Sequence, residues 1–513
     1  MLKRSVIAAV GLLAWGGNMA GLCQDRKPYA EPYRPQVHFS PRENWTNDPN
    51  GLVYFDGEYH LFFQYNPFGD KWGHMSWGHA VSSDLLHWKE LPVALPEHDG
   101  EMIFTGSVVV DEHNTSGLCK DGKPCMVAVY TSHRPGNGRE QRESQSIASS
   151  QDRGRTWQFY AGNPVLDLDM ADFRDPNVSW NDQIHRWVMA VALPNEHKVA
   201  FYTSADLKQW AKISTFGPEG ATGGQWECPD LLEVPAEGGK KIWALKVGIN
   251  PGALQGGSGE QYFLGNFDGH EFHSLPGTPV RWTDYGKDSY CAISFNHLPP
   301  GEKPTLLGWM SNWQYADKLP TQPWRGQMTL PRRVVAVKDG DSFVLSEDPV
   351  IASLHDGPAR MIGKQLAPKE EAAELLSSES PMEIQLTFAP ADAEKFGVRL
   401  YSDDSHWTEI GFDTARHVVY TNRLHAGVSP GENFLVRTEA AAVATRPWNL
   451  KIVIDHSSVE VFAQDGTIAM TNLVLPPTSN VKAVAFRKGG TKAVAVSGRS
   501  WRLNSIWTSV QEK

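Results

Sequence analysis

The chain is poor in cysteine and has no surplus of positive charge, and both absences narrow its possible functions. Of 513 residues only 5 are cysteine, too few for a disulfide scaffold, and none stands at a spacing typical of zinc ligands. Lys and Arg number 48 against 59 Asp and Glu, so the formal net charge is −11. Proteins that bind nucleic acid usually carry a basic surplus, so the composition disfavours that partner.

Long apolar runs and long helical patterns are also missing. The apolar run from Ser5 to Leu13 is short, follows two cations and precedes small residues, as in an export signal. No later run approaches the ~18 apolar residues of a membrane span. We therefore predict a signal peptide over residues 1–23 and a periplasmic or secreted chain. Lipid anchoring at Cys23 is less favoured, because Leu22 stands where a small residue is needed.

Glycine, proline and aromatic residues are plentiful. The chain has 46 Gly and 34 Pro, which indicates many tight turns. It also has 19 Trp, 14 Tyr and 21 Phe, whose flat faces suit sugar rings as well as protein cores. An all-β chain with frequent turns is the predicted class.

Strand pairs repeat through the first 340 residues. Residues 51–55 and 58–63 flank Asp56-Gly57, a dipeptide typical of a two-residue hairpin turn. Similar strand, turn, strand units follow Ser107, Asp175, Glu227 and Asp288. Five such units predict a five-bladed β-propeller over residues 34–340. A linker with a short helix is expected over 341–365, and alternating strands predict a β-sandwich over 366–513.

Three carboxylates occupy matching places in different units. Asp48, Asp175 and Glu227 each precede the first strand of a unit, with a proline close behind. Equivalent strand ends converge at the centre of a propeller, so the three acids should share one pocket. Any one of them alone would be a turn former, but converging carboxylates shift one another's pKa values, as acid/base sites require. Cleavage of a glycosidic bond uses such a pair.

The hairpin register places the first acid more closely. With the turn centred between Asp56 and Gly57, we expect Asp48 opposite Tyr65 and near Gln64. Other side chains suited to sugar hydroxyls lie close to the acids in sequence: Asn47, Gln64, Trp72, Ser107, Arg174 and Trp309. Arg174 is expected to hold Asp175 ionised by charge pairing. Trp72 and Ser107 have structural alternatives, packing a blade and capping backbone.

Four cysteines follow the predicted leader. Cys119 and Cys125 bracket a turn and could close a small loop in an oxidising compartment, and both the bridged and the free state stay open. Cys228 and Cys291 are predicted to be single buried thiols.

Around the acids the sequence resembles glycoside hydrolase family 32, the invertases, inulinases, levanases and other fructan β-fructosidases. Trp45–Gly51 resembles the family's nucleophile motif, Phe104–Ser107 its sugar-contacting turn, Arg174–Pro176 its transition-state-stabiliser motif and Trp226–Pro229 its acid/base motif. The resemblance covers about residues 34–510 and implies a five-bladed propeller with a β-sandwich. Thr46, Thr105 and Ser289 depart from the commoner Met, Ser and Phe, and none of these changes removes a reacting group.

The resemblance implies a secreted, retaining exo-β-fructosidase that releases terminal fructose from levan, inulin, fructo-oligosaccharides or sucrose. Asp48 would be the nucleophile, Glu227 the acid/base and Asp175 the transition-state stabiliser. The implied substrate-binding residues are Asn47, Gln64, Trp72, Phe104, Ser107, Arg174 and Trp309. Glu227 is expected to have a raised pKa because Asp48 and Asp175 lie near it.

Two other readings stay open. A sucrose-preferring invertase or a fructosyltransferase would use the same three acids. A non-catalytic glycan-binding propeller is the more distant alternative, since such a protein would lack the three acids that this sequence has. No cofactor, metal or nucleic-acid partner is expected. The sandwich is expected to shield a propeller flank rather than to bind sugar.

Overall fold

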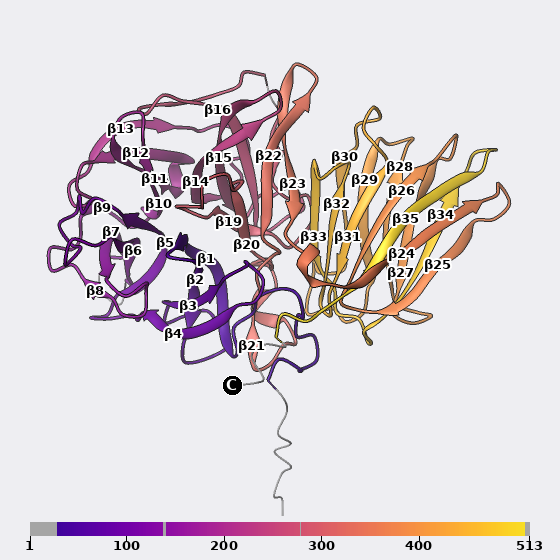
Figure 1. Cartoon of the computed structure of the whole chain (residues 1–513), viewed down its shortest axis with the longest axis horizontal. Coiled ribbons are helices and arrows are strands. Elements are labelled where there is room, and N and C mark those ends of the chain that lie inside the picture. The colour runs from indigo at the N-terminus through magenta and orange to yellow at the C-terminus, as the bar shows by residue number, and fades with distance from the viewer. Residues whose placement is uncertain (1–27, 137–139, 278, 508–513) are drawn as a thin grey trace, which may run out of the picture.

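The structure is a computed structural model that describes residues 28–136, 140–277 and 279–507, and nearly all of its elements are strands (Figure 1). The predicted signal peptide and Cys23 lie outside the described residues. Within these ranges no helix is long and apolar enough to cross a membrane. The three short 3-10 helices assigned there cover Pro194–Glu196, Ala316–Lys318 and Ala352–Leu354.

The N-terminal region forms the rounded indigo-to-salmon body of Figure 1. Its described strands assemble into four hydrogen-bonded sheets. The first sheet contains β21 (Trp324–Arg325), β1 (Asn44–Phe55), β2 (Glu58–Asn66), β3 (Ser76–Ser82) and β4 (Lys89–Leu95). The second contains β5 (Met102–Asp111), β6 (Cys125–Arg134), β7 (Arg142–Ser150), β8 (Gln158–Phe159) and β9 (Leu166–Met170). The third contains β10 (Arg174–Asn181), β11 (Arg186–Leu193), β12 (Lys198–Ser204) and β13 (Ala211–Phe216). The fourth contains β14 (Gln225–Ala236), β15 (Lys240–Asn250), β16 (Gly259–Phe267), β17 (Phe272–Ser274), β18 (Arg281–Trp282), β19 (Tyr290–Ser294), β20 (Thr305–Trp309), β22 (Arg332–Asp339) and β23 (Ser342–Pro349).

Five of these strands lie innermost. β1, β5, β10, β14 and β19 contact one another in a closed ring, and their labels gather around the middle of the body in Figure 1. The nine-stranded sheet supplies two of the five, because a parallel pairing of Ala236 with Ala336 joins the group that starts at β14 to the group that includes β19. The predicted order of a propeller followed by a sandwich is therefore confirmed. The count of five blades stays a prediction, since hydrogen bonding merges two of the strand groups.

The first hairpin has the predicted turn and a different register. Phe55 pairs with Glu58, and Asp56 and Gly57 have φ of 50° and 85°, as a two-residue turn requires. The register then shifts twice, and Thr46 rather than Asp48 pairs with Tyr65. The predicted position of Asp48 opposite Tyr65 is thus wrong, because bulges insert unpaired residues into β1.

The region between the two domains also differs from the prediction. Residues 341–365 were expected to be a linker with a short helix. The short helix is present as the 3-10 helix Ala352–Leu354. The free linker is not, because β23 pairs along its whole length with β22 and β24 (His355–Leu366) already belongs to the sandwich. β23 thereby extends a propeller sheet and β24 a sandwich sheet, so only residues 350–354 lie between them.

The C-terminal region, orange to yellow in Figure 1, packs two six-stranded antiparallel sheets face to face. One contains β24, β35 (Val494–Leu503), β26 (Met382–Ala389), β31 (Asn449–Ile454), β32 (Ser458–Ala463) and β33 (Ile468–Leu473). The other contains β25 (Ala372–Glu379), β34 (Asn480–Lys488), β27 (Lys395–Tyr401), β28 (Trp407–Asp413), β29 (Val418–His425) and β30 (Arg437–Ala441). Alternate residues such as Ile384, Phe396 and Ile452 point between the sheets and are fully buried.

Buried charges join the two domains. Arg332 of the propeller donates at 2.9 Å to both Asp284 and Glu347 and at 2.6 Å to Glu460 of the sandwich. His38, just before β1, contacts Glu460 as well. Such a network is costly to break, because removing one partner leaves a buried charge uncompensated.

A second set of contacts from the sandwich binds one propeller loop, residues 284–288. Asp288 binds Arg423 of β29, and its other contacts include the Leu473 N–H at 2.8 Å. A Cβ on Gly286 would lie 2.1 Å from the Thr471 carbonyl oxygen, so only glycine fits there. The sandwich therefore fixes residues 284–288, which lead directly into β19.

We predict that the His38 contact makes stability depend on pH. Burial alone would lower the pKa of His38, but hydrogen bonds to Asp455 and Glu460 raise it from 6.5 to about 9. The stabilisation is then complete below pH 6.5 and is lost as the pH rises through 9, a change of roughly 3 kcal/mol at most. The free energy of unfolding of the wild type, measured relative to His38→Gln by denaturant titration, should decline across this window.

His113→Gln, which replaces an exposed histidine, is the matched control. The difference in unfolding free energy between wild type and His113→Gln should not change with pH. If it declines as the His38→Gln difference does, or if the His38→Gln difference is constant with pH, the His38 contact is not the cause.

Candidate active site

All five inner strands carry a bulge near their starts. The register shifts lie between Thr46 and Pro49, Ile103 and Gly106, Arg174 and Asn177, Glu227 and Asp230, and Tyr290 and Ile293. A bulge re-aims the side chains of its residues. The residues at these shifts include Asp48, Thr105, Asp175, Glu227 and Tyr290, all of which line one pocket. Five equivalent irregularities thus build a single site.

The pocket has a volume of about 360 Å³, within the ~300–1,000 Å³ common for small-ligand sites. Its lining residues are Asn47, Asp48, Gln64, Trp72, Phe104, Thr105, His133, Gln141, Glu143, Asp172, Arg174, Asp175, Gln225, Glu227, Asn250, Tyr290 and Trp313. Polar groups dominate the lining, and the aromatic rings lie among them. This mixture suits a ligand with many hydroxyl groups.

Asp48 is buried at the pocket wall. Thr105 donates to its Oδ2 at 3.1 Å, whereas its Oδ1 has no hydrogen-bond partner among the described residues. Burial raises the pKa of Asp48 to about 7, and the charge of Glu227 contributes to the shift. One carboxylate oxygen is therefore held and the other is left unoccupied.

Asp175 lies on the neighbouring side, at a backbone φ of 65° that residues other than glycine seldom adopt. Its N–H donates to Thr131 at 3.0 Å, and its Oδ2 accepts the Cys228 N–H at 2.9 Å. Burial raises the pKa of Asp175 well above its usual range, although the charge of Arg174 opposes the shift. Arg174 makes no direct ion pair with Asp175, so the predicted pairing of these two residues is wrong.

Arg174 pairs with Glu227 instead. Its Nε and Nη2 lie 3.1 and 3.0 Å from Glu227 Oε1, and its other donors reach Glu143, Asp172 and Gln225. All five N–H groups of the guanidinium are used in this way. Arg174 is thus positioned to orient Glu227, and the structure leaves it no free donor for a ring hydroxyl.

Tyr290 holds the second oxygen of Glu227. Its hydroxyl donates to Glu227 Oε2. Burial and the charge of Glu227 raise the pKa of Tyr290 well above its usual range, so the hydroxyl keeps its proton and stays a donor. Glu227 is consequently fixed through both oxygens, by Arg174 from one side and Tyr290 from the other.

Five of the predicted binding residues line the pocket, namely Arg174, described above, and Asn47, Gln64, Trp72 and Phe104. Asn47 accepts from the Trp45 indole, and Gln64 donates to the Ile103 carbonyl and keeps its oxygen free. Trp72, which is 47% exposed, stands at the rim in an edge contact with Phe104. These groups offer hydroxyl contacts and an aromatic wall.

Two predicted binding residues do not reach the pocket. Ser107 is buried, donates to the Pro176 carbonyl and accepts the Val178 N–H, so it ties two inner strands together. This is the backbone-capping role that its sequence context left open. Trp309 is fully buried against Trp45, and its neighbour Trp313 lines the pocket in its place.

Sequence reasoning also missed Tyr290 and the pair His133 and Glu143. Tyr290 occupies the bulge of the fifth repeat, equivalent to the place of the acids, and that repeat spacing was the available signal. His133 stacks on Phe104 at 4.1 Å and contacts Glu143 at 3.0 Å. Nothing in the local sequence around these two residues points to a pocket.

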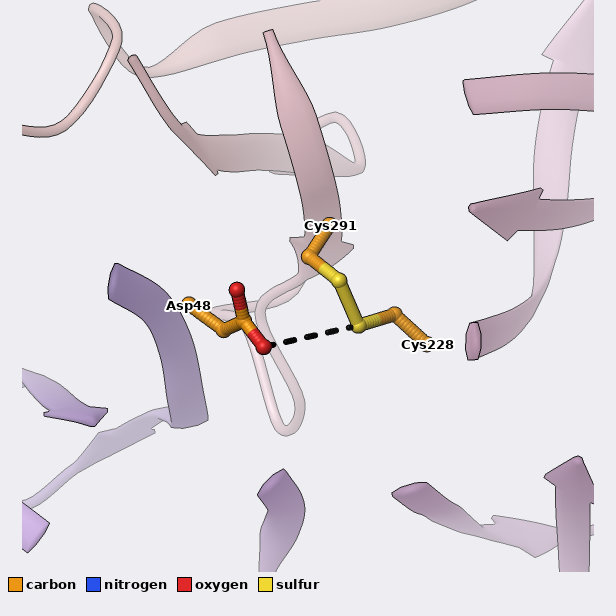
Figure 2. Close-up of side chains that lie close together, drawn as sticks. All are labelled: Asp48, Cys228 and Cys291. Carbon is orange, nitrogen blue, oxygen red and sulfur yellow. Dashed lines mark hydrogen bonds between the residues drawn. A yellow bond between two sulfur atoms is a disulfide. The ribbon is translucent and has the colours of Figure 1, made fainter. Parts of the chain in front are cut away.

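Two disulfides are present in the described chain. Cys119 joins Cys125, the bridge that their spacing allowed. Cys228 joins Cys291, so the prediction of two single thiols is wrong. Figure 2 shows this second bridge beside Asp48, with the Cys228 sulfur 3.9 Å from Asp48 Oδ2. The two cysteines lie 63 residues apart in sequence, and only the closed ring of inner strands brings them together.

Family models match almost all of this architecture. "Glycosyl hydrolases family 32 N-terminal domain" matches residues 38–347, and "Glycosyl hydrolases family 32 C terminal" matches residues 356–502. The chain belongs to glycosyl hydrolase family 32. The family resemblance seen in the motifs is thereby confirmed.

Named relatives within family 32 are similar over most of the chain. A levanase of Bacillus subtilis (strain 168) is 41% identical over 497 residues, which cover 94% of this chain and 72% of the relative. An extracellular exo-inulinase of Aspergillus awamori is 39% identical over 518 residues, covering 93% and 96%. A crystal structure of exo-inulinase from Aspergillus awamori superposes with a TM-score of 0.85 at 38% identity, covering 93% of this chain and all of that one.

We predict that Tyr290→Phe slows this family 32 glycosidase without unfolding it. The substitution removes only the hydroxyl that orients Glu227, and a hydrogen bond to a charged group contributes about 1.5–3 kcal/mol, so kcat should fall roughly tenfold to a hundredfold. Steady-state kinetics with thermal unfolding as a folding check will measure the effect.

Tyr202→Phe is the matched control, since Tyr202 is buried in a hydrophobic cluster that lies outside the pocket lining. Equal turnover by Tyr290→Phe and wild type would show that the hydroxyl does not support Glu227.

Proposed function

We propose that this chain is a retaining exo-β-fructosidase that releases terminal fructose from β-D-fructofuranosides such as levan, inulin, fructo-oligosaccharides and sucrose. The convergence of Asp48, Asp175 and Glu227 from three strand groups on one pocket carries the proposal. The names of two relatives, levanase and exo-inulinase, support the substrate class. A pocket, as opposed to a long cleft, suits attack on the end of a chain.

In the proposed first step Asp48 attacks C2 of the terminal fructosyl unit. The Asp48 carboxylate lines the pocket, and Thr105 orients it by donating to Oδ2. Glu227 gives its proton to the departing oxygen, and a covalent fructosyl–enzyme remains. The site must therefore carry one proton on Glu227 and none on Asp48 when the substrate binds.

In the second step water releases fructose. Glu227, now ionised, takes a proton from the attacking water, and the bond to Asp48 breaks with retention of configuration. Arg174 and Tyr290 keep the Glu227 carboxyl group in place in both steps. Asp175 is proposed to accept hydrogen bonds from ring hydroxyls and to stabilise the positive charge that develops at C2. The mechanism needs no cofactor.

Export of the chain is part of the proposal. The cationic and apolar N-terminus fits a signal peptide over residues 1–23, and the relative in Aspergillus awamori is described as extracellular. A polymeric substrate outside the cell would require such a location.

The early products from levan, inulin and sucrose test the proposed activity. Chromatography should show fructose from all three from the first time point. A ladder of oligomers from levan or inulin would contradict exo cleavage. Oligomers longer than the substrate, formed from sucrose, would indicate a fructosyltransferase, and turnover of sucrose alone would indicate an invertase.

The assigned roles of the two reacting carboxylates predict different variant profiles. Asp48→Ala should abolish turnover of every substrate. Glu227→Ala should abolish turnover of sucrose but retain kcat/KM for β-D-fructofuranosyl fluoride, whose leaving group needs no proton. Asp182→Ala, at an exposed position outside the pocket lining, is the control. Substantial sucrose hydrolysis by a folded Asp48→Ala variant would refute its role as nucleophile.

A further inference from the structure

We propose that the Cys228–Cys291 disulfide is a positioning element for the acid/base carboxyl group. It would hold Glu227 and Tyr290 in register across two strand groups and so keep the proton donor aimed at the leaving oxygen. This inference rests on the proposed function.

The covalent link joins the immediate neighbours of two interacting residues. Cys228 follows Glu227 in β14, and Cys291 follows Tyr290 in β19. The Tyr290 hydroxyl donates to Glu227, so the disulfide and this hydrogen bond cross the same gap side by side. β14 and β19 are not paired with each other in the sheet, where β22 and β20 intervene. The disulfide is thus a direct tie between strands that the backbone ladder does not join.

Both cysteines have unusual backbone conformations. Cys228 has φ of 48° and Cys291 has φ of 46°, in the left-handed region that residues other than glycine rarely adopt. Each lies within the bulge of its inner strand. Such conformations persist only where the surroundings enforce them. A cross-link between the two bulges is suited to that task.

The same residue pair also reaches the other two carboxylates. The Cys228 N–H donates to Asp175 Oδ2 at 2.9 Å. Its sulfur lies 3.9 Å from Asp48 Oδ2, as Figure 2 shows. Cys228 therefore contacts the proposed nucleophile and the proposed stabiliser, and it is bonded to the proposed acid/base. Loss of the bridge would place two thiols with exchangeable protons beside Asp48.

The other disulfide supplies a matched control. Cys119 and Cys125 close a loop of six-residue separation between β5 and β6, and neither lines the pocket. A Cys119→Ala/Cys125→Ala double variant removes one bridge and leaves the site unchanged. A Cys228→Ala/Cys291→Ala double variant removes the other bridge without leaving a buried thiol.

Peptide mapping of the native protein without reductant should first recover Cys228 linked to Cys291. Kinetics then compare sucrose with β-D-fructofuranosyl fluoride, because kcat/KM reports steps up to the fructosyl–enzyme and only sucrose needs a proton donor there. For Cys228→Ala/Cys291→Ala we expect kcat/KM on sucrose to fall at least about tenfold, while kcat/KM on the fluoride stays within about twofold. This is a weaker form of the Glu227→Ala profile. The control variant should match wild type on both substrates.

Reduction keeps the test usable where the double variant does not fold. A dithiol added to the folded Cys119→Ala/Cys125→Ala protein would convert the remaining disulfide into two thiols and itself become a cyclic disulfide. The same selective loss on sucrose should appear and should reverse on reoxidation. The buffer should contain a chelator, because the ligand atoms of Asp48, Cys228 and Cys291 lie within 4.8 Å of one another and free thiolates there could capture a metal ion.

Three outcomes would overturn the inference. They are free thiols at Cys228 and Cys291 in the native protein, wild-type kcat/KM on sucrose without the bridge, and an equal loss on both substrates, which indicates general loosening of the site. Failure of the proposed function looks different, because wild type and the Cys119→Ala/Cys125→Ala control would then hydrolyse neither substrate.

Discussion

The buried charge contacts between the sandwich and the propeller are the constraint on which the rest of the molecule depends. Arg423 of the sandwich binds Asp288, and the loop that contains Asp288 leads directly to Tyr290. Tyr290 in turn donates to Glu227. The C-terminal domain is therefore connected to the pocket through two residues of one short segment, although it contributes no residue to the lining. The sequence predicted only a shielding role for this domain, and the contacts with residues 284–288 add a supporting one.

Arg174 stabilises the close approach of three acidic side chains. Glu143, Asp172 and Glu227 would repel one another and lose hydration on burial, and Arg174 contacts all three. Asp48 and Asp175 receive no such direct pairing, and burial raises the pKa of each. The site thus combines carboxylates that Arg174 contacts directly with two buried carboxylates whose pKa values burial raises.

The acids could be predicted from the sequence because their signal is positional. A carboxylate before a proline at the start of a repeated strand pair is visible three times over, and bulges later confirmed the equivalence of the places. Trp309 and Trp313 could not be told apart in that way, because both pack against Trp45 and only the folded chain shows that Trp313 lines the pocket. The Ser107 hydroxyl and the partner of Cys228 likewise depend on contacts between different strand groups. The register predicted for Asp48 was wrong because β1 contains bulges, and no residue type marks a bulge reliably.

The two ends of the described chain meet. Tyr29 stacks on Trp507 at 3.9 Å, the Trp507 indole donates to the Pro35 carbonyl, and the Gln36 and Val37 N–H groups bind Asp455 of the sandwich. During synthesis the segment before β1 precedes every strand of the propeller, whereas its partners Asp455 and Trp507 follow all of them. The propeller therefore stays incompletely anchored until the sandwich has been synthesised, so the maturation of the two domains is coupled.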